Sequence, residues 1–155
     1  MAVTDPEARL RELGYELPDA PPPVGAYVPV VRAGGLVVTS GQLPFRAGKL
    51  IAEGRVGAEL DVAAAGEAAR VCVLNALAQL KQLLGTLDRV KRVVRLEGYV
   101  HSADGFYQQP AVLNPASELL TEVFGERGKH TRVALGISVM PLNAPVQIAL
   151  WVEAE

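Results

Sequence analysis

The stretch TRVALGISVMPLNAPVQ, residues 131–147, carries the alternation that decides the fold. Every second residue in its first half is apolar, which is the period of a β-strand with one buried face. The apolar residues are Val133, Leu135, Ile137 and Val139. The side chains between them are small except for Arg132, which therefore faces space that a ligand or a partner can fill. Its planar fork suits a carboxylate held by two hydrogen bonds, and a solvated surface charge is the alternative.

The flanking sequence adds strands and two helices to this element. Strands are expected over 27–31, 36–40, 94–100 and 146–152. Gly34 and Gly35 supply the positive φ of a tight hairpin between the first two strands. A long helix begins at the cap Asp61 and ends at Gly85, and a second helix includes residues 115–124. The order β, β, α, β, α, β, β is typical of an α+β fold with helices on one face of a sheet.

Two strand patterns assign side chains to faces. In the strand over 94–100, the residues expected on one face are Val94, Leu96, Gly98 and Val100. In the last strand, Val146, Ile148, Leu150 and Val152 share one face, and Gln147, Ala149 and Trp151 share the other. Both faces of the last strand are thus partly apolar, so one of them is a candidate for contact with another subunit.

The first 23 residues form a separate N-terminal element. Thr4 or Asp5 is placed to cap a short helix that runs to Leu13 and has Pro6 in its first turn. The proline-rich segment 17–25 cannot be a helix or a central strand, so it is expected to run extended over the surface. Residues 24–155 then make up the main domain.

Composition excludes several classes of protein. The 155 residues suit one domain, and 15 basic against 17 acidic side chains leave no electrostatic footprint for nucleic acid or anionic membrane. Cys72, the single cysteine, is expected to be a buried small residue, which fits a reducing compartment. No signal peptide and no run of about 18 apolar residues is present, so the expected location is the cytoplasm.

Few motifs of known chemistry are present. No P-loop, GxGxxG, HExxH or CxxC pattern occurs, and His101 and His130 lack the spacing of metal ligands, so no metal or nucleotide cofactor is expected. His130 is the better functional candidate of the two because it lies two positions from Arg132. Ser40 and Gly41 end a strand with hydrogen-bonding groups, as either a binding edge or a capped turn. Tyr27 is either a core-edge residue or a pocket residue with its phenol pointing inward.

Four segments together carry a family resemblance. They are GAYVPVVRAGGLVVTSGQLP, LNALAQLKQLLGTLD, FYQQPAVLN and TRVALGISVMPLNAPVQI. In this order and spacing the sequence resembles the RidA family, also named YjgF or endoribonuclease L-PSP. The resemblance implies a chorismate-mutase-like mixed sheet with two helices on one face, a homotrimer with ligand clefts between subunits, and no cofactor. It also implies metabolite damage control by an enamine/imine deaminase, a hydrolase that converts 2-aminoacrylate-type imines to 2-keto acids and ammonia.

The resemblance also implies roles for particular residues. By motif, Arg132 is the arginine that pairs with the substrate carboxylate. Tyr27, Ser40, Gly41 and Asn114 match positions that line or support the cleft. Backbone groups near Gly41 or Ala134 are expected to contact the imine nitrogen. The older name of the family suggests ribonuclease activity or translation inhibition, but the chain has no stripe of basic residues that would bind RNA.

Gln147 departs from the family pattern. Active imine deaminases usually have a glutamate there, and an amide orients water but cannot take its proton. A non-catalytic trimer that binds small carboxylates or 2-keto acids is therefore the alternative function. If residues 131–139 and 146–152 form a hairpin, Gln147 lies opposite Val139, more than about 20 Å from Arg132 along the strand. Either the pairing is not a hairpin, or a site using both residues needs a neighbouring subunit.

Overall fold

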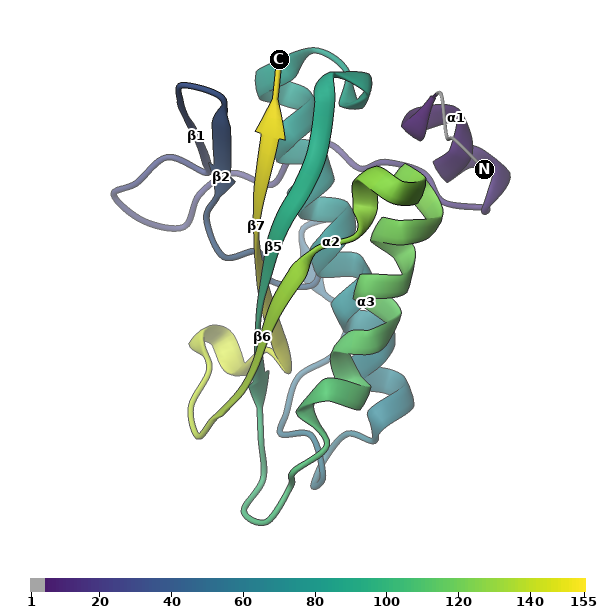
Figure 1. Cartoon of the computed structure of the whole chain (residues 1–155). Coiled ribbons are helices and arrows are strands. Elements are labelled where there is room, and N and C mark those ends of the chain that lie inside the picture. Colours follow the sequence, from purple (N-terminus) through teal and green to yellow (C-terminus); the bar gives the residue numbers. More distant parts are fainter. Residues whose placement is uncertain (1–4) are drawn as a thin grey trace.

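Two long helices cover one face of a five-stranded sheet in the computed structural model of the chain, which describes residues 5–155 (Figure 1). The helices are α1 (Pro6–Glu12), α2 (Val62–Leu84) and α3 (Gln109–Phe124), with short 3-10 helices η1 (Leu87–Arg89), η2 (Gly125–Gly128) and η3 (Pro141–Asn143). The strands are β1 (Val30–Ala33), β2 (Leu36–Thr39), β3 (Phe45–Arg46), β4 (Lys49–Leu50), β5 (Val90–His101), β6 (Thr131–Ile137) and β7 (Val146–Ala154). The predicted element order and α+β class are confirmed, and the short β3–β4 hairpin is an addition.

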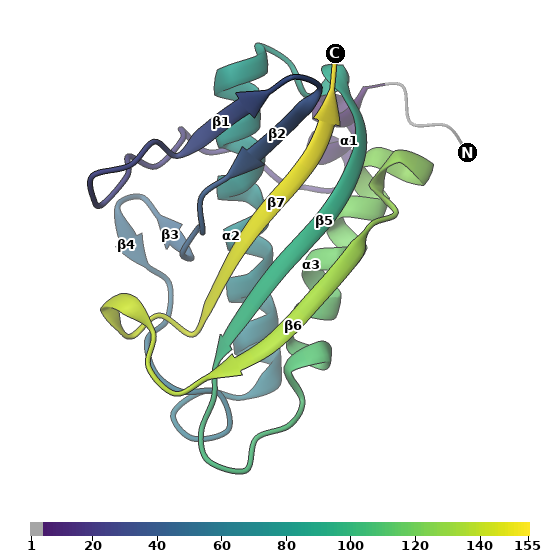
Figure 2. The same cartoon turned by 60° about the vertical axis from the view of Figure 1, so that its left-hand side comes forward.

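The sheet has the strand order β1-β2-β7-β5-β6. β5 pairs with β6 in parallel, because α3 carries the chain back between them, and its pairing with β7 is antiparallel. β5 therefore lies between the two strands that a hairpin would have joined (Figure 2). The sequence left open whether residues 131–139 and 146–152 form a hairpin. In the structure they do not.

The helix α2 begins and ends where the sequence predicts. The Asp61 side chain accepts a hydrogen bond of 2.8 Å from the N–H of Ala64, and Gly85 ends the helix with a φ of +86°. The helix lies against β7, where Cys72 is buried and burial raises the pKa of its thiol well above the usual range. The expectation that Cys72 is a structural residue agrees with this position.

A β-bulge in β5 corrects one prediction. Leu96, Gly98 and Val100 face the helices as expected, but Val94 is exposed and Val93 is buried instead. The pairing with β7 shifts between Val93 and Arg95, and the extra residue of a bulge reverses the alternation of faces. The face predicted for Val94 was therefore wrong.

The apolar face of β6 points away from the helices. Arg132, Ala134 and Gly136 pair with the core-facing residues of β5, and a Cβ on Gly136 would lie 2.6 Å from the side chain of Gln109 in α3. Leu135, on the opposite face, is 52% exposed. The expectation of a face buried within the chain was wrong, because the edge strand needs small residues where it meets α3. We call the sheet face that no helix covers the outer face (Figure 2).

The first hairpin and the N-terminal helix follow the prediction in most respects. Of the two glycines between β1 and β2, only Gly34 has a positive φ, which suits a two-residue turn with glycine first. Asp5 caps α1 as predicted, and the alternative cap at residue 4 lies outside the described residues. Residues 15–23 contain no helix or strand, as the prolines require.

Side-chain contacts attach α1 to the body of the chain. Leu10 is 1% exposed and belongs to the main hydrophobic core. Glu7 accepts a hydrogen bond from the N–H of Leu87 at 3.0 Å and lies 3.3 Å from the ammonium of Lys81. Partial burial raises the pKa of Glu7, but these two contacts outweigh it and the net pKa is lowered. The domain boundary at residue 24 stays a prediction, although α1 contributes to the core.

Candidate functional site

Arg132 lies at the start of β6 and points toward α3. Its Nη1 donates hydrogen bonds to Asn114 Oδ1 at 2.9 Å and to Ser117 Oγ at 3.2 Å. Within residues 5–155, its Nε and Nη2 groups make no hydrogen bond to another residue. These two groups form the side-on fork that binds a carboxylate with two parallel hydrogen bonds. The guanidinium is therefore oriented by α3 while its fork is left for another molecule.

His130 contacts the same serine from the other side. Its Nδ1 lies 2.6 Å from the carbonyl oxygen of Gly128, and its Nε2 lies 3.0 Å from Ser117 Oγ. A carbonyl oxygen only accepts, so Nδ1 carries the proton and Nε2 of the neutral ring is the acceptor. Because the serine also accepts from Arg132, its hydroxyl proton is directed at Nε2. Sequence reasoning missed Ser117, although its spacing of three from Asn114 places both on one face of the helix.

An open depression surrounds these groups. Its volume is about 380 Å³. The residues that line it are Ser117, Glu118, Thr121, Lys129, His130 and Arg132. The depression has two cationic side chains, Lys129 and Arg132. The ammonium of Lys129 forms an ion pair with Glu126 at 2.7 Å. Glu118 contributes one carboxylate. We call this the Arg132 depression.

Gln147 and Gly41 lie together, but on the outer face. A Cβ on Gly41 would come within 2.5 Å of Gln147 Cδ, so only glycine lets the amide lie against this backbone. In the sheet register Gln147 pairs with Tyr99, whereas Arg132 is in the row of Leu96. Those two rows differ by three positions, and an odd difference places side chains on opposite faces. The structure therefore does not bring Arg132 and Gln147 of one chain to a single ligand.

The other predicted residues are distributed over the chain. Ser40 follows β2, and its hydroxyl accepts a hydrogen bond of 3.2 Å from Gln42 Nε2. Tyr27 is 46% exposed, and its hydroxyl accepts a weak contact of 3.4 Å from the N–H of Val24. Ala134, two residues after Arg132 in β6, packs against the main core. Thus Asn114 lies with Arg132, and Ser40 and Gly41 lie near Gln147.

A polar cluster on the outer face was not singled out from the sequence. Arg95 Nε donates to Glu97 Oε1 at 3.2 Å, and the Tyr99 hydroxyl donates to Glu97 Oε2 at 3.4 Å. Burial and then the Glu97 charge raise the pKa of Tyr99. Tyr99 is the register partner of Gln147, so a carboxylate lies in the row next to the amide. Polar residues at every second position of RLEGY, residues 95–99, are the signal that indicates this cluster.

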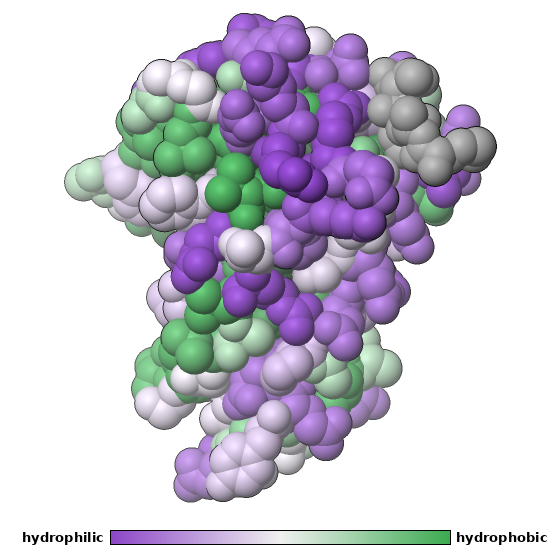
Figure 3. All heavy atoms as spheres, in the orientation of Figure 1, coloured by the Kyte–Doolittle hydropathy of each residue, from purple (hydrophilic) through white to green (hydrophobic). Residues whose placement is uncertain are grey.

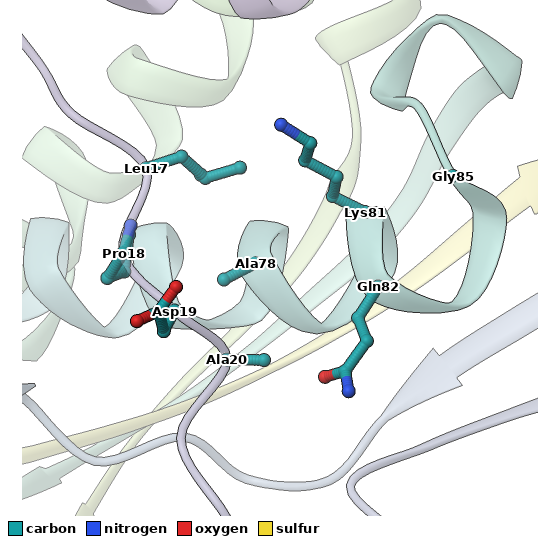
Figure 4. Close-up of a pocket in the computed structure, with 8 residues that line it drawn as sticks. All are labelled: Leu17, Pro18, Asp19, Ala20, Ala78, Lys81, Gln82 and Gly85. Carbon is teal, nitrogen blue, oxygen red and sulfur yellow. The ribbon is translucent and has the colours of Figure 1, made fainter.

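A further groove lies between the N-terminal segment and α2 (Figure 4). Its volume is about 440 Å³. Asp19 lies on the side of the segment, and Lys81 and Gln82 project from the helix. Lys81 also pairs with Glu7. None of the residues expected to carry function lines this groove, so the Arg132 depression and the outer face remain the candidate sites.

Comparison with known proteins assigns the family. The model of a family described as "YjgF/chorismate mutase-like, putative endoribonuclease" matches residues 7–154. The chain belongs to this family. The resemblance of four sequence segments to RidA, another name of the YjgF family, is thereby confirmed.

Several known proteins are similar to the chain over nearly its whole length. Protein TCP17 of Trypanosoma cruzi is 42% identical over 147 residues, which are 94% of this chain and 92% of that protein. The structure of Atu1372 from Agrobacterium tumefaciens, a protein of unknown function, has a TM-score of 0.91 and 44% identity, covering 97% of this chain and 92% of that one. A "putative endoribonuclease" from Shewanella oneidensis MR-1 has a TM-score of 0.94 and 42% identity, covering 96% and 99%.

A more distant YjgF-like structure shows the fold alone. Escherichia coli TdcF with bound serine has a TM-score of 0.63 and 21% identity, covering 88% of this chain and 94% of that one. The mixed sheet with helices on one face is therefore the fold of the family, as predicted.

Within residues 5–155, which the structure describes, no cluster of three His, Cys, Asp or Glu side chains is arranged to hold a metal ion. Over the same residues, no helix has the length and apolar character needed to cross a membrane.

Proposed function

We propose that the chain is a RidA-like protein that binds small carboxylate-bearing imines and hydrolyses them to 2-keto acids and ammonia. The observation that supports this is the orientation of Arg132. Asn114 and Ser117 hold its Nη1, and its Nε and Nη2 fork has no partner in residues 5–155 at the edge of an open depression. A guanidinium fixed in this way loses little freedom when it binds a carboxylate.

The reaction needs little more than a bound substrate and a positioned water. Water adds to the imine carbon, a proton moves to nitrogen, and ammonia leaves as the carbonyl forms. Binding and orientation of the reactants lower the barrier even without a strong base. The serine bound to TdcF is an amino acid of the same small, carboxylate-bearing kind, which supports this substrate class by likeness of fold.

The proposal includes a homotrimer in which the outer faces contact one another. Leu135 and Val31 are exposed on this face, and Trp151 and Ala149 lie partly exposed beside them. In the space-filling view, hydrophobic residues are most concentrated along the left-hand side, which is the side of the outer face (Figure 3). Gln147, which lies on the outer face, would then reach a cleft between subunits. A site that uses both Arg132 and Gln147 requires residues from two subunits.

Replacing Arg132 with alanine is expected to lower kcat/KM for ammonia release by about 10²-fold. Two charge-assisted hydrogen bonds to a carboxylate are together worth about 3 kcal/mol. The measurement is release of ammonia and pyruvate from 2-aminoacrylate generated in situ. Arg132→Lys keeps the charge but loses the fork, so an intermediate rate is expected. Arg11→Ala, which removes an exposed arginine of α1, is the control. Wild-type protein that gives no acceleration over buffer at high concentration would remove deamination from the proposal.

The second candidate function is silent binding of small carboxylates or 2-keto acids. Gln147 favours it, because an amide cannot accept the proton of water. In that case wild-type protein binds pyruvate in calorimetry but releases no ammonia from the imine. Gln147→Glu is then expected to raise ammonia release to at least about tenfold above the rate in buffer, since a general base contributes about 10² to 10⁴ in rate. Gln108→Glu, at an exposed position before α3, is the matched control. Equal rates in both variants would count against a role of Gln147 in water activation.

A further inference from the structure

The hydroxyl of Ser117 lies between a base and a cation at the surface of the Arg132 depression. His130 Nε2 is 3.0 Å from its oxygen, and Arg132 Nη1 is 3.2 Å from it. The short contact from His130 Nδ1 to the carbonyl of Gly128 fixes the tautomer in which Nε2 accepts. The serine therefore donates its proton to the imidazole while it accepts a hydrogen bond from the guanidinium.

This arrangement has the parts of an activated nucleophile. A serine is made reactive by a neighbouring base that a third group orients, and here the third group is the Gly128 carbonyl. The Arg132 N–H groups favour negative charge on the serine oxygen and on an oxyanion formed beside it. Ser117 and His130 both line the open depression, so an acyl group can approach the hydroxyl.

We propose that Ser117, with His130 as its base, cleaves small esters whose acyl part carries a carboxylate. The substrate class follows from the free Nε and Nη2 fork of Arg132, which would hold that carboxylate while Nη1 stays at the serine. The depression is open, and its lining has two cationic side chains, Arg132 and Lys129, and one carboxylate, Glu118. Short acyl groups that carry a negative charge therefore fit it best. This activity goes beyond the imine chemistry and does not depend on it.

The chemical steps balance without a cofactor. Ser117 Oγ forms a bond to the acyl carbon, the bond from that carbon to the alcohol oxygen breaks, and the serine proton passes through His130 Nε2 to the departing alcohol. Water then attacks the acyl-serine, gives one proton to His130, and returns the serine to its starting state as that proton moves to Oγ. The products are one carboxylic acid and one alcohol.

The first test has two parts, both on the full chain. A fluorophosphonate probe is reacted with the protein, and mass spectrometry identifies the modified residue. Hydrolysis of mono-p-nitrophenyl succinate is then measured. Label is expected on Ser117, and Ser117→Ala should lose both the label and the hydrolysis. Ser138→Ala removes an exposed serine in the loop after β6 and should retain both. His130→Gln should lower the rate of hydrolysis by about 10² or more, because a general base contributes this much.

The second test decides the matter if the probe is too large to react. Cys72 is the single cysteine of the sequence and is buried, so a thiol in the Ser117→Cys variant reports on the site alone. Histidine and arginine neighbours lower the pKa of a thiol, so alkylation by iodoacetamide at pH 6 should be at least about tenfold faster than in Ser138→Cys. Equal alkylation rates in the two variants, with both folded, would overturn the proposal. Loss of ammonia release alone would not, because that reaction concerns the proposed deaminase.

Discussion

Gly128→Ala is expected to lower the free energy of unfolding by about 3 kcal/mol. A Cβ at this position would overlap the carbonyl oxygen of Leu120 and lie 2.8 Å from its carbonyl carbon and 3.0 Å from Thr121 Cα. These atoms belong to the backbone of α3, so no side-chain rotation relieves the overlap. The carbonyl of Gly128 also accepts from His130, so the shift that admits the methyl group displaces the histidine.

Urea denaturation of the two proteins measures this effect. Gly35→Ala is the matched control, because a Cβ there has no neighbour nearer than 3.9 Å and the residue has no positive φ. The control is expected to stay within about 0.5 kcal/mol of wild type. In Gly128→Ala, the reactivity of Ser117 toward the fluorophosphonate probe should fall as well. A stability change as small as that of the control would show that η2 moves freely against α3.

Leu135→Asp is expected to weaken association of the chain by about 10² to 10⁴-fold. Leu135 lies on the outer face, which the proposed homotrimer buries, and an unpaired buried charge costs about 3 to 5 kcal/mol. Glu97 is on the same face, in the row beside it, and adds repulsion between like charges. The variant should therefore sediment as a monomer at concentrations where the wild type is assembled.

A leucine outside the outer face provides the control for this prediction. Leu83, on α2, is 43% exposed, close to the value for Leu135, but it lies on a helix. Leu83→Asp should leave the sedimentation coefficient unchanged. Sedimentation velocity over a range of concentrations, with circular dichroism to show that each variant is folded, makes the comparison. If Leu135→Asp sediments like the wild type, the outer face is not the interface.

The sequence predicted the elements well where one local signal dominates. Asp61 and Gly85 bound α2 because a side-chain cap and a left-handed residue act within one turn. The last strand was assigned correctly to both faces, since its four core residues are large and alternate without interruption. The start of α3 was harder to predict. Pro115 lies inside this helix and packs against Gly66 of α2, a tertiary contact that no local rule shows.

The sheet face of each side chain and the make-up of the candidate site depend on pairing between strands that lie far apart in the sequence. The bulge in β5 is invisible in its own sequence because it arises from the register with β7. The sequence left open whether Arg132 and Gln147 of one chain could share a ligand, because the insertion of β5 between their strands determines which way each points. Ser117 was missed since a serine on a helix has no distinctive pattern until His130 is brought to it from the loop before β6.

The position of β7 has a consequence for how the protein is made. This strand lies between β2 and β5, and it follows every other described strand in the order of synthesis. On the ribosome, the N-terminal hairpin and the β5–α3–β6 unit emerge without the strand that joins them. The growing polypeptide therefore displays the edges of β2 and β5 that pair with β7 until residues 146–154 appear, which makes a nascent-chain chaperone most useful in that interval.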